Sequence, residues 1–147
     1  VYQEKIFKKI RILDKNDKPT DTFKMLDQMK IEVVLQNNDR FTNADYGIII
    51  LNSFGQRITS FATWMCKERN NSIARRIVLN IPQIRLVNGS YFISLSSTIH
   101  SSAEWLDKLD TVIKFKVEVS NIFNSGKVFD SSFGMIVPEG ELKIFNN

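Results

Sequence analysis

The chain has 147 residues, of which 43% are hydrophobic, 20 are lysine or arginine and 16 are aspartate or glutamate. This length and apolar content predict one domain with its own core, and no apolar run approaches the roughly 18 to 20 residues of a membrane-spanning helix. The lone Cys66 excludes an internal disulfide and a cysteine-rich zinc module, and the net charge of +4 lacks the basic stripe typical of nucleic-acid binding.

Apolar and polar residues alternate with a period of two along much of the chain, which predicts half-buried β-strands. The hairpin signal Asn52-Ser53-Phe54-Gly55 joins two of these strands. The strands expected in the first half of the chain are 8–13, 29–35, 48–51 and 57–62.

The second half shows the same pattern, with one interruption. Residues 101–109 predict a helical turn or two, through Trp105, Leu106 and Leu109. The strands expected here are 72–81, 91–99, 111–119 and a short last strand at 141–145. The sequence therefore predicts an all-β chain of seven to nine short strands.

Tyr91 distinguishes between the possible β architectures. Immunoglobulin-like sandwiches often carry a tyrosine at the start of a core strand, whose hydroxyl bonds backbone a few residues upstream. The spacing Leu86-x-x-Gly89-x-Tyr91 fits this corner, because Gly89 adopts a positive φ at little cost. We therefore expect an immunoglobulin-like antiparallel β-sandwich, with a jelly-roll-like variant left open.

If Tyr91 faces the core, alternation turns the next residues of its strand to the outer face of the sheet. These are Phe92, Ser94 and Ser96, with Lys116 on the neighbouring strand. A sugar ring offers an apolar C–H face for an aromatic ring and hydroxyls for polar partners. This surface is therefore a candidate carbohydrate-binding platform.

A second candidate lies in the loop that follows the strand at 57–62. It places Trp64 near three planar polar side chains, Glu68, Arg69 and Asn70. The structural alternative for Trp64 is that it plugs the end of the sandwich. Trp105, in contrast, is expected to pack its own turn onto the sandwich.

Catalytic signals are sparse. His100 is the only histidine, and no G-x-S-x-G elbow accompanies it. Cys66 has apolar neighbours in sequence, which predicts an inert thiol. No phosphate-binding loop of the G-x-x-x-x-G-K-[ST] type is present, so the chain is not expected to hydrolyse ATP. We predict no catalytic residues, metal or cofactor.

Three stretches together resemble one family. They are 51–58 (LNSFGQRI), 86–94 (LVNGSYFIS) and 106–118 (LDKLDTVIKFKVE). Their order and spacing are similar to those of the C-terminal carbohydrate-binding domain of the ATPase subunit (Wzt type) of ABC transporters that export O-antigen polysaccharides. Asn52 departs from this pattern, since an aspartate is usual there.

The resemblance implies a non-enzymatic domain, spanning 1–147, that binds O-polysaccharide near its non-reducing end and couples this recognition to export. The implied partners are the ATPase and membrane subunits of the transporter, at the cytoplasmic face of the bacterial inner membrane. Family members also dimerise by exchanging the C-terminal strand. Here the segment from about 134 to 147 is separated from the core by the loop 120–132, which would permit exchange.

Two other function classes remain open from the sequence. One is an immunoglobulin-like structural or adhesion module that contacts protein. The other is a glycoside-processing enzyme, which requires two carboxylates about 5 to 10 Å apart in a cleft.

Overall fold

The computed structural model describes residues 5–36, 44–66, 74–99, 102 and 104–146. In these ranges β-strands make up all regular structure except one short 3-10 turn, η1, which confirms the all-β class. No helix of the described chain is long and apolar enough to cross a membrane. In order, the elements are β1 (Phe7–Leu13), β2 (Thr22–Lys24), β3 (Met29–Leu35), β4 (Ala44–Asn52), β5 (Arg57–Ala62), η1 (Thr63–Met65), β6 (Arg76–Ile81), β7 (Gly89–Ile99) and β8 (Trp105–Glu118).

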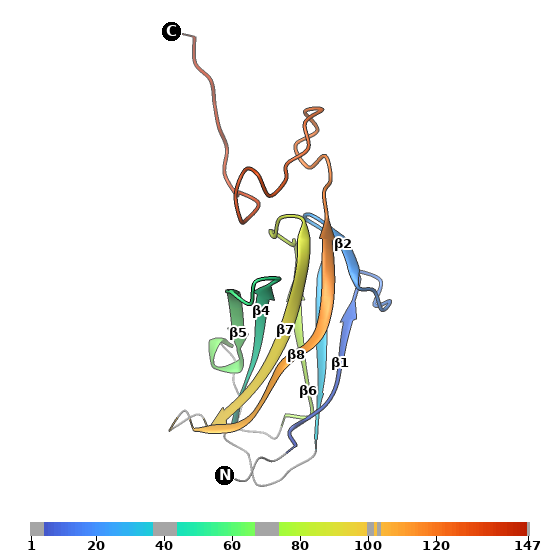
Figure 1. Ribbon diagram of the computed structural model, residues 1–147, viewed down its shortest axis with the longest axis vertical. Helices are drawn as coiled ribbons and strands as arrows, with labels where there is room; N and C mark the ends of the chain where they lie inside the picture. Colours follow the sequence, from blue (N-terminus) through green and yellow to red (C-terminus); the bar gives the residue numbers. More distant parts are fainter. Residues whose placement is uncertain (1–4, 37–43, 67–73, 100–101, 103, 147) are drawn as a thin grey trace.

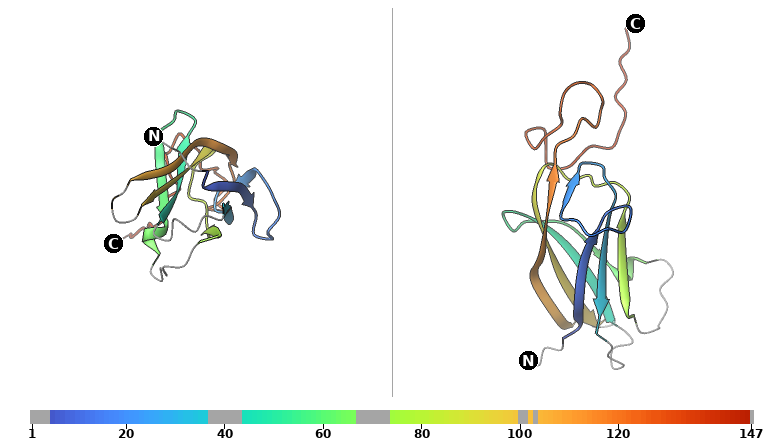
Figure 2. Two further views of the ribbon diagram at one scale, coloured as in Figure 1. Left: turned by 90° about the horizontal axis from the view of Figure 1, so that it is seen from below. Right: turned by 90° about the vertical axis from the view of Figure 1, so that its right-hand side faces the viewer.

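The strands form two sheets that face each other as a sandwich (Figure 1; Figure 2). One sheet has three strands in the order β1-β3-β6, and the other has five in the order β2-β8-β7-β4-β5. The pairs are antiparallel as predicted, except that the short β2 runs parallel to β8. The predicted strands at 29–35 and 57–62 match β3 and β5 residue for residue.

The core lies between the two sheets and is built by alternation along each strand. On β3, Met29, Ile31 and Val33 are fully buried, while the residues between them face outward or make polar contacts. Ile93 on β7 and Phe115 on β8 meet them from the other sheet, at 0% and 1% exposure. The β-branched and aromatic content of these strands suits a pleated surface that is buried on one side.

The predicted tyrosine corner is present. The Tyr91 hydroxyl donates a hydrogen bond of 2.7 Å to the Val87 carbonyl, and its ring stacks on Phe115 with centroids 5.5 Å apart. Gly89 adopts a φ of 154°, a backbone conformation that residues other than glycine rarely adopt. Burial also raises the pKa of Tyr91. The ring and hydroxyl together fix the entry of β7 into the sandwich.

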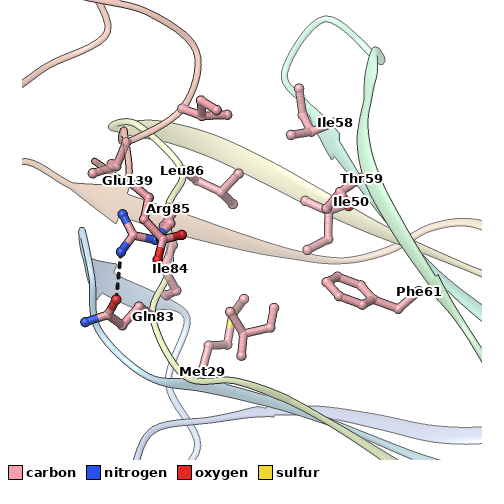
Figure 3. A pocket seen from close by; sticks show the side chains of 13 residues that line it. Met29, Ile50, Ile58, Thr59, Phe61, Gln83, Ile84, Arg85, Leu86 and Glu139 are labelled. Carbon is pink, nitrogen blue, oxygen red and sulfur yellow. Dashed lines mark hydrogen bonds and ion pairs between the residues drawn. The ribbon is translucent and has the colours of Figure 1, made fainter. Parts of the chain in front are cut away.

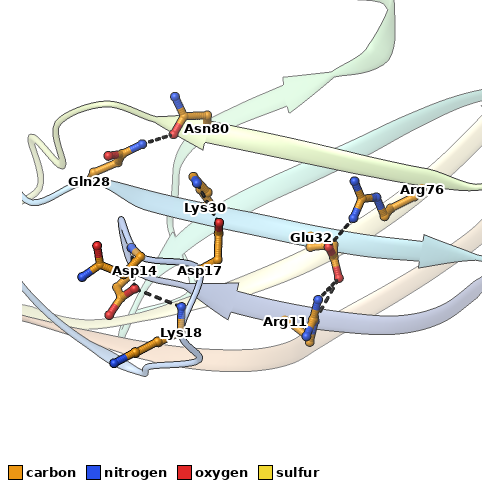
Figure 4. Close-up of polar contacts among 10 residues, drawn as sticks. Arg11, Asp14, Asp17, Lys18, Gln28, Lys30, Glu32, Arg76 and Asn80 are labelled. Carbon is orange, nitrogen blue, oxygen red and sulfur yellow. Dashed lines mark hydrogen bonds and ion pairs between the residues drawn. The ribbon is translucent and has the colours of Figure 1, made fainter.

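A polar ladder crosses the outer face of the three-stranded sheet (Figure 4). Arg11 on β1 donates two bonds to one oxygen of Glu32 on β3, at 2.9 and 2.6 Å, and Arg76 on β6 donates to the other at 2.9 Å. The hydrogen bond from Arg11, with the charge of Arg76, holds the pKa of Glu32 below its ordinary value. Glu32 thus joins all three strands.

Replacing Glu32 by glutamine is expected to flatten the acid dependence of stability. Because the pKa of Glu32 is lower in the folded state, its ionised carboxylate stabilises the fold at pH values above the ordinary pKa of 4.5. This stabilisation is lost as the pH falls through the lower, folded-state pKa. The difference in free energy of unfolding between wild type and Glu32→Gln should therefore be largest near neutral pH and shrink as the pH falls below the ordinary pKa of 4.5. Urea denaturation across this range checks it, with Glu104→Gln as the control. A difference that does not depend on pH would contradict it.

The predicted helical turn at 101–109 is wrong, because Trp105 to Leu109 form the first part of β8. Two register shifts explain the error: one opposite Ser97 and Thr98, the other opposite Ser94. Extra residues at these bulges break the period of two, so that Leu106 and Leu109 acquire a helix-like spacing. The strand expected at 111–119 is therefore the second half of a longer strand.

The predicted last strand at 141–145 is also wrong in this structure. The C-terminal segment first packs on the sandwich. Ile136 forms an isolated antiparallel β-bridge with Leu86, and Val137 is 1% exposed. Beyond Glu139 the chain runs away from the sandwich (Figure 1). Leu142 and Ile144 are 94% and 87% exposed there. A strand needs a hydrogen-bonding neighbour, and this tail has none among the described residues.

Candidate functional site

The outer face of the five-stranded sheet carries the predicted platform. On β7, Tyr91, Ile93 and Leu95 are buried against the core at 5%, 0% and 1% exposure, as alternation predicts. The intervening residues therefore face outward. Phe92 pairs with Leu51 on β4 and with Lys114 on β8, so these three side chains share the outer face.

Phe92 presents a half-buried ring that is accessible from outside. The ammonium of Lys114 lies over this ring, 5.8 Å from its centroid. Lys116, further along β8, is exposed and lies opposite Ser90, with Glu118 at 3.9 Å. The predicted residues Phe92 and Lys116 thus lie near the same end of the same face.

Ser94 has a different role from the one predicted. It is 5% exposed, and its hydroxyl accepts a hydrogen bond of 3.1 Å from the Thr111 backbone N–H. Three residues of β8, 110–112, bulge opposite it, and Thr111 adopts a φ of 54°, which is strained for a β-branched residue. Ser94 therefore holds the bulge in place and offers little surface to a ligand.

Ser96 lies on the outer face beside a glycine. A Cβ atom on Gly47, its neighbour on β4, would come within 2.5 Å of the Ser96 hydroxyl oxygen. The outer face of the sheet consequently carries only small side chains at this point. Ala62 of β5 pairs with Gly47 on the side opposite Ser96. A flat stretch of small residues is compatible with an extended ligand that lies on the sheet.

Trp105 is the residue that the sequence interpretation missed. It lies opposite Thr98 on the same face as Phe92, it is 56% exposed, and the ammonium of Lys108 is 5.4 Å from the ring centroid. The helical interpretation of 101–109 concealed it. The expectation that Trp105 packs onto the sandwich is wrong, because as part of β8 its side chain faces outward.

Trp64 lies at the same end of the sheet as Trp105. It belongs to η1 and is 60% exposed, so it does not plug the sandwich. The preceding Thr63 donates its hydroxyl to Asp45 at 2.9 Å, which ties η1 to β4. Asp45 in turn lies opposite Thr98, the cross-strand neighbour of Trp105.

The other predicted members of the Trp64 cluster, Glu68, Arg69 and Asn70, lie outside the described residues, as does His100. Cys66 is exposed, and it lines a small cavity together with apolar side chains such as Phe61 and Leu79. Within the described ranges no three His, Cys, Asp or Glu side chains come together in a group that could hold a metal.

A cavity of about 490 Å³ opens between the two sheets beside β5 (Figure 3). Apolar side chains such as Met29, Ile50 and Phe61 line it. Its polar side is formed by Arg85, which donates to Gln83 at 2.9 Å, and by Glu139 of the C-terminal segment. This lining suits apolar side chains better than a sugar, whose hydroxyls need several polar partners.

A solved structure of another protein has the same fold as this chain. The crystal structure of the C-terminal domain of Wzt superposes with a TM-score of 0.74 at 16% sequence identity, over 98% of this chain and 87% of that one. No curated protein matches the chain in sequence. The family model of the Wzt C-terminal domain matches residues 4–133. The chain therefore belongs to the Wzt C-terminal domain family, a non-catalytic carbohydrate-binding domain of ABC transporters.

Proposed function

We propose that the chain binds O-antigen polysaccharide, near its non-reducing end, on the outer face of the five-stranded sheet. The observation that carries this proposal is that two aromatic rings on this face each have a lysine ammonium group above them. Lys114 covers Phe92, and Lys108 covers Trp105. Aromatic rings stack on the C–H faces of sugars, and flexible lysine ammonium groups donate hydrogen bonds to hydroxyls.

The spacing of the two rings fits a polymer rather than a single sugar. Phe92 and the Thr98 position opposite Trp105 are about 20 Å apart along β7, at roughly 3.3 Å per residue. Low side chains at Gly47 and Ser96 lie between them. Trp64 extends the surface at the Trp105 end, and Lys116 extends it at the Phe92 end.

Membership of the Wzt C-terminal domain family supports a role in transport. We propose that polysaccharide bound to this domain is handed to the ATPase and membrane subunits of the exporter, at the cytoplasmic face of the inner membrane. Contacts with one or two sugars at a time are individually weak, since each ordered residue offsets part of the interaction energy. Two copies that bind one polymer would raise the effective affinity.

We further propose that two copies associate through the tail from Gly140 onward. In the isolated chain the tail exposes Leu142, Ile144 and Phe145 at 94%, 87% and 77%. An alternating tail of this kind can complete a sheet of a second copy, and the apolar cavity of Figure 3 begins where the tail leaves its own sandwich. Residues up to Glu139 stay with their own subunit.

Removing residues 140–147 is expected to convert a dimer to a monomer and leave the unfolding temperature of the subunit nearly unchanged. The full-length variant Leu142→Asp/Ile144→Asp should have the same effect, because it places charges in the proposed interface. Light scattering at matched concentrations checks both. A dimer that survives in both variants would contradict the role of the tail.

Binding itself is tested by calorimetric titration of the domain with the O-polysaccharide of the strain that encodes it and with an unrelated O-polysaccharide. We expect saturable binding to the first and much weaker binding to the second. Equal binding to both, or binding to neither, would contradict the proposed function. Binding to neither would favour the protein-contacting alternative.

A further inference from the structure

We infer that a small cavity at the end of the sandwich binds one uncharged sugar residue of the polymer. This end cavity has a volume of about 260 Å³ and lies between the β4–β5 hairpin, the turn before Tyr91 and the C-terminal segment. Its lining includes Asn52, Ser53, Phe54, Asn88, Ser90 and Ser131. The inference rests on the proposed glycan binding and adds a site to it.

The hairpin holds an aromatic ring at the mouth of the end cavity. Phe54 is 86% exposed at the hairpin tip. The side-chain oxygen of Asn52 accepts hydrogen bonds from the backbone N–H groups of Phe54 and Gln56, each at 3.0 Å. The side-chain amide nitrogen of Asn52 donates to the Gln56 side chain at 2.8 Å. The exposed ring is therefore held on a well-ordered turn, so little freedom is lost when a ligand stacks on it.

The opposite walls supply hydrogen-bonding groups. Asn88 accepts the N–H of Ser131 at 2.8 Å, which ties the C-terminal segment to the turn. The Asn88 amide hydrogens bond no other residue that the structure describes, so they can donate to a ligand. The hydroxyls of Ser53 and Ser90 bond no other residue in the described part of the chain. Amide and hydroxyl groups of this kind both donate to and accept from sugar hydroxyls.

The lining also determines the charge of the ligand. None of the residues that line the end cavity is acidic or basic. A ligand with a carboxylate, phosphate or ammonium group would lose hydration there without gaining an opposite charge. A polar cavity of about 500 Å³ near Asp14 differs in this respect, since Lys24, Asp27 and Glu118 line it. The end cavity therefore selects a neutral ring.

The size and position of the end cavity suit a single sugar residue. Small-molecule sites usually measure about 300 to 1,000 Å³, so a cavity of about 260 Å³ holds one ring. Asn52 and Tyr91 form the last cross-strand pair of the sheet before the cavity, and Leu51 and Phe92 form the next pair inward. A polymer that lies on Phe92 therefore has the end cavity beside it.

Methyl glycosides test this inference because each is too short to reach both aromatic contacts of the outer face. Amide NMR spectra of the full chain would be recorded with the neutral methyl hexosides and methyl deoxyhexosides, and with methyl glucuronide as the charged probe. We expect at least one neutral glycoside to shift the amides of Ser53, Asn88 and Ser90 saturably, with a Kd on the order of millimolar. The charged probe should bind several-fold more weakly.

Phe54→Ala should weaken the binding of that glycoside roughly three- to tenfold, as expected for the loss of an aromatic contact. Phe123→Ala removes a ring that is 54% exposed but lies outside the cavity, and it should have no effect. No saturable shift with any neutral glycoside, or equal binding by Phe54→Ala, would overturn the inference. If the polymer still binds through Trp105, the end cavity alone is refuted. If glycosides bind but the polymer does not, the proposed function fails instead.

Discussion

Replacing Trp105 by alanine is expected to weaken polysaccharide binding about tenfold, and the double variant Phe92→Ala/Trp105→Ala about a hundredfold. Each ring contributes stacking of about 0.5 to 1.5 kcal/mol in addition to the apolar area that it buries. The two positions are about 20 Å apart along the sheet, which is beyond the range at which substitutions usually couple, so the two losses should add. Calorimetric titration of the two single variants and the double variant measures this directly.

The fold should survive these substitutions. Trp105 is 56% exposed, and its ring contact within the described chain is with Lys108, itself an exposed residue. The unfolding temperatures of the variants should therefore lie within a few degrees of the wild-type value. Val119→Ala, a substitution at a residue that is 44% exposed just after β8, serves as the matched control for binding. Unchanged affinity of the double variant would exclude the outer face as the binding surface.

Replacing Tyr91 by alanine is expected to cost about 3 to 5 kcal/mol of unfolding free energy, the usual loss when a buried aromatic ring is deleted. The ring is 5% exposed and stacks on Phe115. Tyr91→Phe keeps the ring and removes only the hydroxyl, leaving the Val87 carbonyl without its 2.7 Å partner. That variant should cost about 1 to 2 kcal/mol.

Chemical denaturation of wild type and the two Tyr91 variants separates packing from hydrogen bonding. The order of stability should be wild type, then Tyr91→Phe, then Tyr91→Ala. If Tyr91→Phe proved as stable as wild type, the hydroxyl would have no part in fixing the corner.

The sequence was sufficient to predict the features of the fold that depend on local pattern. Alternation predicted the bounds of β3, the hairpin signal at 52–55 predicted β5, and the Gly89–Tyr91 spacing predicted a corner whose hydrogen bond is present. The errors arose where long-range pairing decides the outcome. β2 has three residues and exists because β8 lies beside it, and the tail beyond Glu139 is no strand because nothing in the described chain pairs with it.

The candidate site was predictable in part for the same reason. Alternation from Tyr91 placed Phe92 outward without knowledge of its neighbours. It could not show that Ser94 is covered, because the bulge at 110–112 that covers it is a feature of β8 alone. The same bulges hid Trp105, whose position on the outer face depends on pairing with Thr98. Treating 105–118 as one bulged strand would have identified it.

We propose that the outer face of the five-stranded sheet holds the polysaccharide. The most direct measurement is an amide NMR titration with an oligosaccharide of several repeats cut from the O-polysaccharide of the encoding strain. We predict that the largest shifts fall on outward positions of β4, β7 and β8, with Phe92, Ser96 and Trp105 among them. Shifts confined to the outer face of β1, β3 and β6, where Glu32 lies, would contradict the claim.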